Sequence, residues 1–198
     1  METKEKIKVA FIGDIGVGKT MLFMRINNLL KNKDDYKDKD NFILQKEELL
    51  NTTNNGCLIQ EKEIILENNE KYILEIWDIS NTQKTMRFNR FPITRKFYFS
   101  NDAQILIFFI EPRNEKIIET TKMLYDINKI RADTNSVHVL CITKNDLNYS
   151  EEELSDVVKF GKENNLEIIF SSAFKENCGL NDDIFKQLIK KYIQNIQK

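Results

Sequence analysis

The sequence predicts an α/β fold in which a mostly parallel sheet of six strands lies between two layers formed by about five helices. Short apolar runs alternate along the chain with segments of helical periodicity, which is the pattern typical of α/β proteins. The chain of 198 residues is also long enough to bury a sizeable core. We therefore expect one domain over residues 1–198, with a polar insert at about 31–48.

Apolar runs of strand length predict the sheet. They cover residues 7–12, 57–66, 72–77, 103–110, 137–142 and 167–170. A helix is expected directly after the first of these runs, because several apolar residues there fall on one helical face. Its stripe consists of Leu22, Phe23, Ile26, Leu29 and Leu30.

Three further helices are predicted between and after the later strands. One is expected within residues 114–131, although its apolar stripe is less regular. The next begins at Ser150, which forms a capping box with Glu153. Asn181 caps the last helix, because a short polar side chain there precedes two aspartates and a long apolar stripe.

Composition excludes several classes of function. Basic and acidic residues number 30 and 31, so the chain lacks the net positive charge of a general nucleic-acid binder. The longest apolar run, residues 105–110, is far shorter than the roughly 20 residues of a membrane-spanning helix. Three cysteines without CxxC spacing and a single histidine argue against a disulfide framework, a zinc cluster and a histidine triad. We expect a cytoplasmic protein.

Two polar segments interrupt the alternation. Residues 31–41 contain four lysines and four aspartates and almost no apolar side chain, so they are expected to form a solvated insert. A calcium-binding loop is a sharper interpretation of these aspartates, but the glycine required at loop position six is absent. Residues 80–92 lack periodicity and are expected to form a long loop.

A phosphate-binding motif follows the first strand and precedes the first helix. Its sequence is Gly13-Asp14-Ile15-Gly16-Val17-Gly18-Lys19-Thr20, which fits the pattern GxxxxGK[ST] in its required context. The glycines let the backbone N–H groups wrap around a phosphate at the helix N-terminus. The lysine ammonium can reach the outer phosphates, and the threonine hydroxyl can ligate Mg²⁺.

Two later motifs indicate which base is bound. The fifth predicted strand ends in Thr143-Lys144-Asn145-Asp146, and the sixth ends in Ser171-Ser172-Ala173-Phe174. Together with the phosphate loop, these segments resemble the [NT]KxD and SAK boxes of the Ras superfamily of small GTPases. The resemblance implies that Asp146 accepts hydrogen bonds from guanine, that Lys144 lies over the base, and that the Ala173 N–H meets the guanine carbonyl. Adenine offers no matching donors to Asp146.

The resemblance extends over nearly the whole chain, from Lys6 to about Ile196. Trp77-Asp78 looks like the start of the WDxxGQ box, in which the aspartate holds Mg²⁺ through water. Residues 93–98, ITRKFY, resemble a segment of the second helix of Rab proteins, so the chain looks most similar to Rab-like members. The family has the P-loop small-GTPase (G domain) fold, which is therefore the fold expected here.

The chain departs from the family at positions that serve hydrolysis. Asn81 and Thr82 stand where the family has glycine and the catalytic glutamine, and Gln83 follows one position later. Ile15 is bulkier than the usual glycine or serine and is expected to crowd that glutamine. For the threonine that closes the first switch we choose Thr53, with Thr52 as the competitor.

The resemblance thus implies GTP or GDP and Mg²⁺ as cofactors. The implied catalytic residues are Lys19, Thr53 and Gln83, and the implied metal ligands are Thr20, Thr53 and Asp78. The implied nucleotide contacts are Asp14, Ile15, Gly16, Val17, Gly18, Lys19, Thr20, Met21, Asp78, Thr143, Lys144, Asp146, Leu147, Ser172, Ala173 and Phe174.

The expected function is a GTP/GDP switch with slow hydrolysis, acting in vesicle or protein transport and binding effector and regulatory proteins through its switch regions. The last five residues, 194–198, contain no prenylatable cysteine, so we expect no direct lipid anchor and recruitment to membranes by partners. A monomer is also expected. The alternative is a scaffold that holds GTP without hydrolysing it and docks protein partners.

Overall fold

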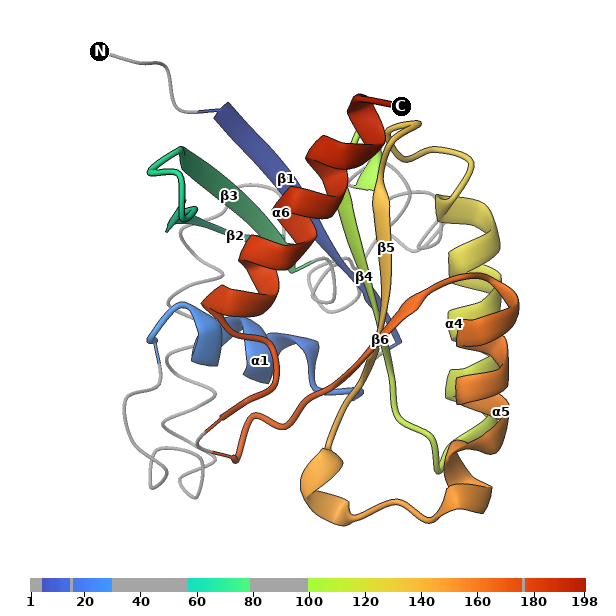
Figure 1. Cartoon of the computed structure of the whole chain (residues 1–198). Coiled ribbons are helices and arrows are strands. Elements are labelled where there is room, and N and C mark those ends of the chain that lie inside the picture. Colours follow the sequence, from blue (N-terminus) through green and yellow to red (C-terminus); the bar gives the residue numbers. More distant parts are fainter. Residues whose placement is uncertain (1–4, 15, 30–56, 79–99, 176) are drawn as a thin grey trace, which may run out of the picture.

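The computed structural model describes residues 5–14, 16–29, 57–78, 100–175 and 177–198. Its sheet has six strands in the order β2-β3-β1-β4-β5-β6 (Figure 1). The strands are β1 (Glu5–Gly13), β2 (Leu58–Ile65), β3 (Lys71–Asp78), β4 (Ile105–Ile110), β5 (Val137–Ile142) and β6 (Glu167–Phe170). Only the β2–β3 pair is antiparallel within this sheet, which confirms the predicted mostly parallel α/β architecture.

The strand order places a topological switch point at β1. This strand pairs with β3 on one side and with β4 on the other, and all three run in parallel. Open parallel sheets bind ligands beyond the carboxyl ends of their strands at such a point. The loop after Gly13 therefore lies where a ligand is expected.

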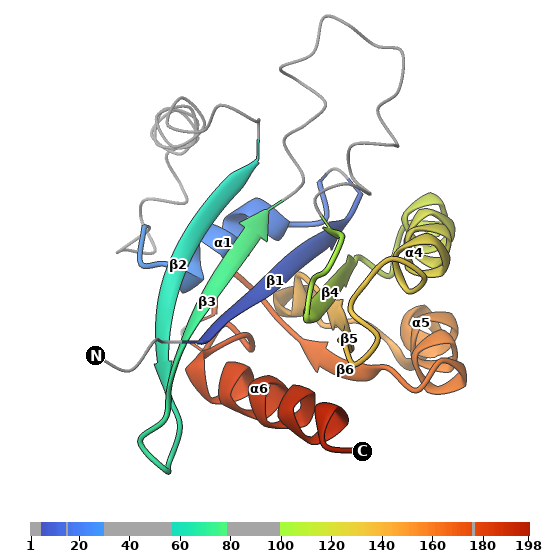
Figure 2. The same cartoon turned by 90° about the horizontal axis from the view of Figure 1, so that it is seen from above.

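Helices cover both faces of the sheet (Figures 1 and 2). They are α1 (Lys19–Ile26), α4 (Glu115–Asn128), α5 (Glu151–Glu163) and α6 (Asp182–Ile196), with a short 3₁₀ turn, η3 (Asn145–Leu147). Lys62 of β2 donates a hydrogen bond to the Ile26 carbonyl at the end of α1 and pairs with Asp182 of α6, so these two helices share a face. The figures show α4 and α5 side by side on the other face.

Aromatic side chains attach the helices to the central strands. The ring of Phe11 meets that of Phe23 from α1 edge to face, with the centroids 6.4 Å apart. On the opposite face, Phe108 packs against Tyr125 of α4 at 5.4 Å. All four side chains are buried; the Phe11–Phe23 pair ties α1 to β1, and the Phe108–Tyr125 pair ties α4 to β4.

The predicted caps are confirmed, and two helix ends differ from prediction. Ser150 and Glu153 form both bonds of the capping box, and the Asn181 side chain accepts a hydrogen bond from the Ile184 N–H. The first helix ends at Ile26 rather than near Leu30, because Asn28 turns to a positive φ of 55°. The helix predicted within 114–131 covers Glu115–Asn128.

Several predicted features lie outside the described residues. These are the polar insert at about 31–48, the loop over 80–92 and the Rab-like segment at 93–98. In the part of the chain that the structure describes, no helix combines the length and apolar character needed to cross a membrane.

Candidate nucleotide-binding site

The loop between β1 and α1 depends on glycine for its path. A Cβ at Gly13 would lie 2.6 Å from the carbonyl oxygen of Phe109 on β4, so only glycine lets the two strands pair this closely. Gly16 and Gly18 have φ values of 83° and 97°, which residues with a side chain rarely adopt. Gly18 precedes α1 and provides no side-chain cap, and the N-terminus of a helix is a common binding site for anions.

Lys19 lies directly over this loop. Its side chain is buried, and its ammonium donates hydrogen bonds to the carbonyl oxygens of Gly13, at 3.0 Å, and Asp14. These bonds hold a positive charge beside the helix N-terminus, whose dipole also attracts anions. The arrangement can bind a phosphate chain.

Thr20 and Asp78 are brought together from the loop and from the end of β3. The Thr20 hydroxyl donates a hydrogen bond of 2.6 Å to Asp78 Oδ2, although the two residues are 58 positions apart in sequence. Asp78 is fully buried. Hydroxyl and carboxylate oxygens are hard ligands of the kind Mg²⁺ prefers, so this donor pair fits the predicted metal site.

Cys57 approaches the same pair from the segment before β2. Its thiol lies 3.2 Å from the carbonyl oxygen of Asp78. Burial, with a smaller contribution from the Asp78 carboxylate, raises the pKa of this thiol far above its usual range. The thiol therefore stays protonated and does not add a soft thiolate ligand to the site.

The second half of the site follows β5 and β6. Asp146 lies in η3, where its carboxylate accepts a hydrogen bond from the buried Ser172 hydroxyl. The same hydroxyl accepts a hydrogen bond from the Phe174 N–H at 3.1 Å. The Asn145 N–H bonds to the Ser171 carbonyl at 3.0 Å, so the turns after the two strands form one unit.

The remaining predicted contacts occupy distinct environments. Val17 is fully buried, and Met21 is partly buried against the core, so these two side chains serve packing. Ala173 is 9% exposed, whereas Leu147 and Phe174 are 44% and 49% exposed beside the Asp146 turn. The predicted residues outside the described ranges are Ile15, Thr52, Thr53, Asn81, Thr82 and Gln83.

Two residues that the sequence motifs do not single out contact the Asp146 turn. Arg113, which follows β4, donates a hydrogen bond to the carbonyl oxygen of Leu147 at 3.3 Å. The Tyr149 hydroxyl donates to the carbonyl oxygen of Thr143 at 2.8 Å. Neither residue belongs to a local pattern, so no signal in the single sequence identifies them.

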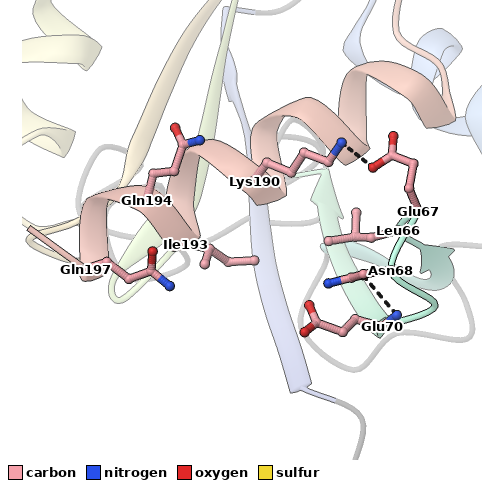
Figure 3. A pocket seen from close by; sticks show the side chains of 8 residues that line it. All are labelled: Leu66, Glu67, Asn68, Glu70, Lys190, Ile193, Gln194 and Gln197. Carbon is pink, nitrogen blue, oxygen red and sulfur yellow. Dashed lines mark hydrogen bonds and ion pairs between the residues drawn. The ribbon is translucent and has the colours of Figure 1, made fainter.

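A separate pocket of about 410 Å³ lies far from these motifs. Figure 3 shows that it opens between the β2–β3 turn and the second half of α6. Leu66 and Ile193 contribute apolar surface, and Glu67 pairs with Lys190 across it. Because β3 begins here, this pocket lies at the opposite end of the strand from Asp78 and is not part of the nucleotide site.

One family of known proteins matches the chain. The model of the Roc domain, described as "Ras of Complex, Roc, domain of DAPkinase", matches residues 8–146. The match covers more than half of the chain and includes both the phosphate loop and the TKND motif. No curated protein matches the chain.

Proposed function

The chain belongs to the Roc family of Ras-superfamily GTPases, and from this premise we propose that it is a GTP/GDP switch with slow hydrolysis of its own. The observation that carries the proposal is the bond between Ser172 and Asp146, at the same sheet edge as the Gly13–Thr20 loop. This edge offers a carboxylate for the base and N–H groups with a lysine for the phosphates.

Base recognition in this proposal rests on Asp146. An ionised carboxylate accepts hydrogen bonds from the N1–H and the 2-amino group of guanine, and adenine has neither donor at those positions. The Ala173 N–H donates to the guanine carbonyl, and the Lys144 stem lies over the base plane. A site built for such donors rejects a base that lacks them, because its polar groups would be left unpaired.

Phosphate binding and hydrolysis use the other half of the site. Lys19 and the N–H groups at the start of α1 bind the phosphate oxygens and stabilise the charge that develops when water attacks in line. Thr20, Asp78 and Thr53 are the residues that would hold Mg²⁺, which when bound neutralises charge on the β- and γ-phosphates. Gln83 is the residue proposed to orient the attacking water.

Slow hydrolysis follows from the departures at Ile15 and Thr82. Ile15 is bulkier than the family's usual glycine or serine and is expected to crowd the catalytic glutamine. Thr82 stands where the family has that glutamine, so Gln83 must act from one position later. Because an unassisted Ras protein already hydrolyses GTP at only about 10⁻⁴ s⁻¹, we expect this chain to be no faster without a partner. A measured rate well above that range would contradict this part of the proposal.

The cellular role proposed is that of a Rab-like protein in vesicle or protein transport. It rests on the ITRKFY segment at 93–98. A cytoplasmic monomer that exposes its switch regions to effector and regulatory proteins, and is recruited to membranes by them, agrees with this role. The sequence departures at Ile15, Asn81 and Thr82 favour a second candidate, a scaffold that binds GTP statically.

The first experiment is chromatography of the nucleotide released from freshly purified protein, followed by reloading with GTP. GDP that forms from the loaded GTP supports the switch, whereas GTP that persists supports the scaffold. Release of no guanine nucleotide, with no uptake on reloading, contradicts both.

The base site is tested with Asp146→Asn. This change replaces an acceptor by a partial donor and should reduce the preference for GTP over ATP. Asp156→Asn, on the exposed face of α5, is the control and should leave that preference unchanged. If Asp146→Asn binds GTP and ATP with the same two affinities as the native chain does, Asp146 does not recognise the base.

A further inference from the structure

The turn that carries Lys144 and Asp146 has an unusual backbone. Lys144 and Asn148, which flank η3, both have left-handed conformations, with φ values of 54° and 51°. Residues other than glycine adopt this region rarely, and they keep it only where surrounding contacts hold them there.

Arg113 makes such contacts, and it joins three segments. Its Nε donates a hydrogen bond of 2.5 Å to Glu153 on α5, and its Nη2 donates to the Leu147 carbonyl at 3.3 Å. Its guanidinium also lies over the ring of Tyr149, 5.2 Å from the centroid. Arg113 therefore links the segment after β4 to the end of the turn and to the start of α5.

Tyr149 holds the other end of the turn. Its hydroxyl donates to the Thr143 carbonyl at 2.8 Å, one residue before the left-handed Lys144. The Tyr149 hydroxyl is protonated at neutral pH, and burial raises its pKa further above the usual range. Glu153, which pairs with Arg113, also accepts a hydrogen bond from the Ser150 N–H at 2.8 Å.

We propose that Arg113 and Tyr149 are positioning residues for base recognition, because together they fix the 143–149 turn in the conformation that presents Asp146 to guanine. This inference rests on the proposed guanine site and extends it to two residues outside the nucleotide motifs. A planar guanidinium suits the role, since its fork of donors and its flat face engage a carboxylate, a carbonyl and an aromatic ring at once. An ammonium at this position would not bond in the same fixed geometry.

The test compares GDP with inosine diphosphate (IDP), which lacks the 2-amino group of guanine. The ratio of the two dissociation constants measures the part of recognition that depends on the 2-amino group, and hence on Asp146. A general loss of stability, or damage to the phosphate loop, would weaken the binding of GDP and of IDP by the same factor. The ratio of their dissociation constants would then stay unchanged. The ratio therefore separates positioning of the turn from a merely structural role.

The variants are Arg113→Ala and Tyr149→Phe, with Lys129→Ala as a matched control. Lys129 is also a half-exposed cation that pairs with a carboxylate, Asp126, and lies over a tyrosine ring, but it is at the end of α4. Arg113→Ala is expected to weaken GDP binding about tenfold and to reduce the preference for GDP over IDP. Tyr149→Phe keeps the ring and loses one hydrogen bond, so it should shift the ratio in the same direction by less.

The outcomes distinguish this inference from the proposed function. If the native chain prefers GDP and both variants keep the native ratio, Arg113 and Tyr149 do not position Asp146 and the inference is wrong. If Lys129→Ala changes the ratio as much as Arg113→Ala does, the effect is not specific to the turn, and the inference again fails. A native chain that binds GDP and IDP equally would show that the 2-amino group is not recognised and would overturn the inference. Equal binding of GTP and ATP by the native chain would instead overturn the guanine site itself.

Discussion

Gly13→Ala should destabilise the fold far more than Gly16→Ala, although both glycines belong to the same loop. Gly13 pairs with Phe109 in the β1–β4 ladder, and an added Cβ would lie 2.6 Å from the Phe109 carbonyl oxygen. At Gly16 an added Cβ meets no atom within 4 Å. Both substitutions therefore place a side chain on a backbone with positive φ, but only Gly13→Ala also produces a steric clash.

The two penalties can be estimated separately. Both glycines have positive φ, at 152° and 83°, and a side chain in such a conformation costs about 1–2 kcal/mol. At Gly13 the clash involves a backbone oxygen of a paired strand, which has no rotamer to escape into. Such overpacking costs about 1–3 kcal/mol more. We expect a loss of about 2–5 kcal/mol for Gly13→Ala and about 1–2 kcal/mol for Gly16→Ala.

The assay is urea unfolding of nucleotide-free protein followed by circular dichroism. Nucleotide must be absent, because a ligand bound to the folded state adds to its apparent stability. The midpoint for Gly13→Ala should fall well below that for Gly16→Ala, which in turn lies slightly below that of the native chain. Equal midpoints for the two variants would refute the argument that the β1–β4 approach requires glycine at position 13.

Two further predictions concern buried side chains, and a third concerns the proposed metal site. Burial lowers the pKa of His138 from 6.5 to about 4, so the unfolded chain binds more protons than the folded one between these values. The free energy of unfolding should therefore fall by at most about 3 kcal/mol as the pH drops through this window. Urea unfolding of His138→Gln at a series of pH values should show a weaker dependence of this free energy on pH. Phe23→Ala should cost about 3–5 kcal/mol in thermal or urea unfolding, because it removes a buried ring that seats α1 on β1. Chelation of Mg²⁺ should speed the release of a fluorescent GDP analogue from the native chain, and Asp78→Asn should remove most of that effect; equal acceleration in both proteins would contradict the proposed metal site.

Much of the fold could be predicted because its determinants are local. The apolar runs at 137–142 and 167–170 coincide with β5 and β6, and the caps at Ser150 and Asn181 form as expected. The early end of α1 also has a local cause. Asn28 adopts the left-handed conformation that ends many helices, and asparagine tolerates it better than most residues.

The strand order and the contacts within the site depend on distant parts of the chain. Apolar periodicity does not specify that β1 lies between β3 and β4, and no strand order was predicted from the sequence. The motifs assigned Thr20 and Asp78 to one metal site, because each has a recognised sequence context, and the structure places the two side chains in hydrogen-bond contact. Arg113 has no such context, since its partners lie 34 and 40 residues further along the chain.

The phosphate half and the base half of the proposed site differ in whether binding a nucleotide would break existing hydrogen bonds. Lys19 donates to two loop carbonyls and Thr20 donates to Asp78, so a phosphate and a metal ion would exchange existing bonds for new ones. Exchange of bonds between ordered groups yields only a modest net gain for each bond. Asp146 is different, because a carboxylate can accept several hydrogen bonds and can keep its bond from Ser172 while it binds the base. In the proposed site, base recognition would therefore add bonds to a turn that is already fixed, and its selectivity would depend on how firmly Arg113 and Tyr149 hold that turn.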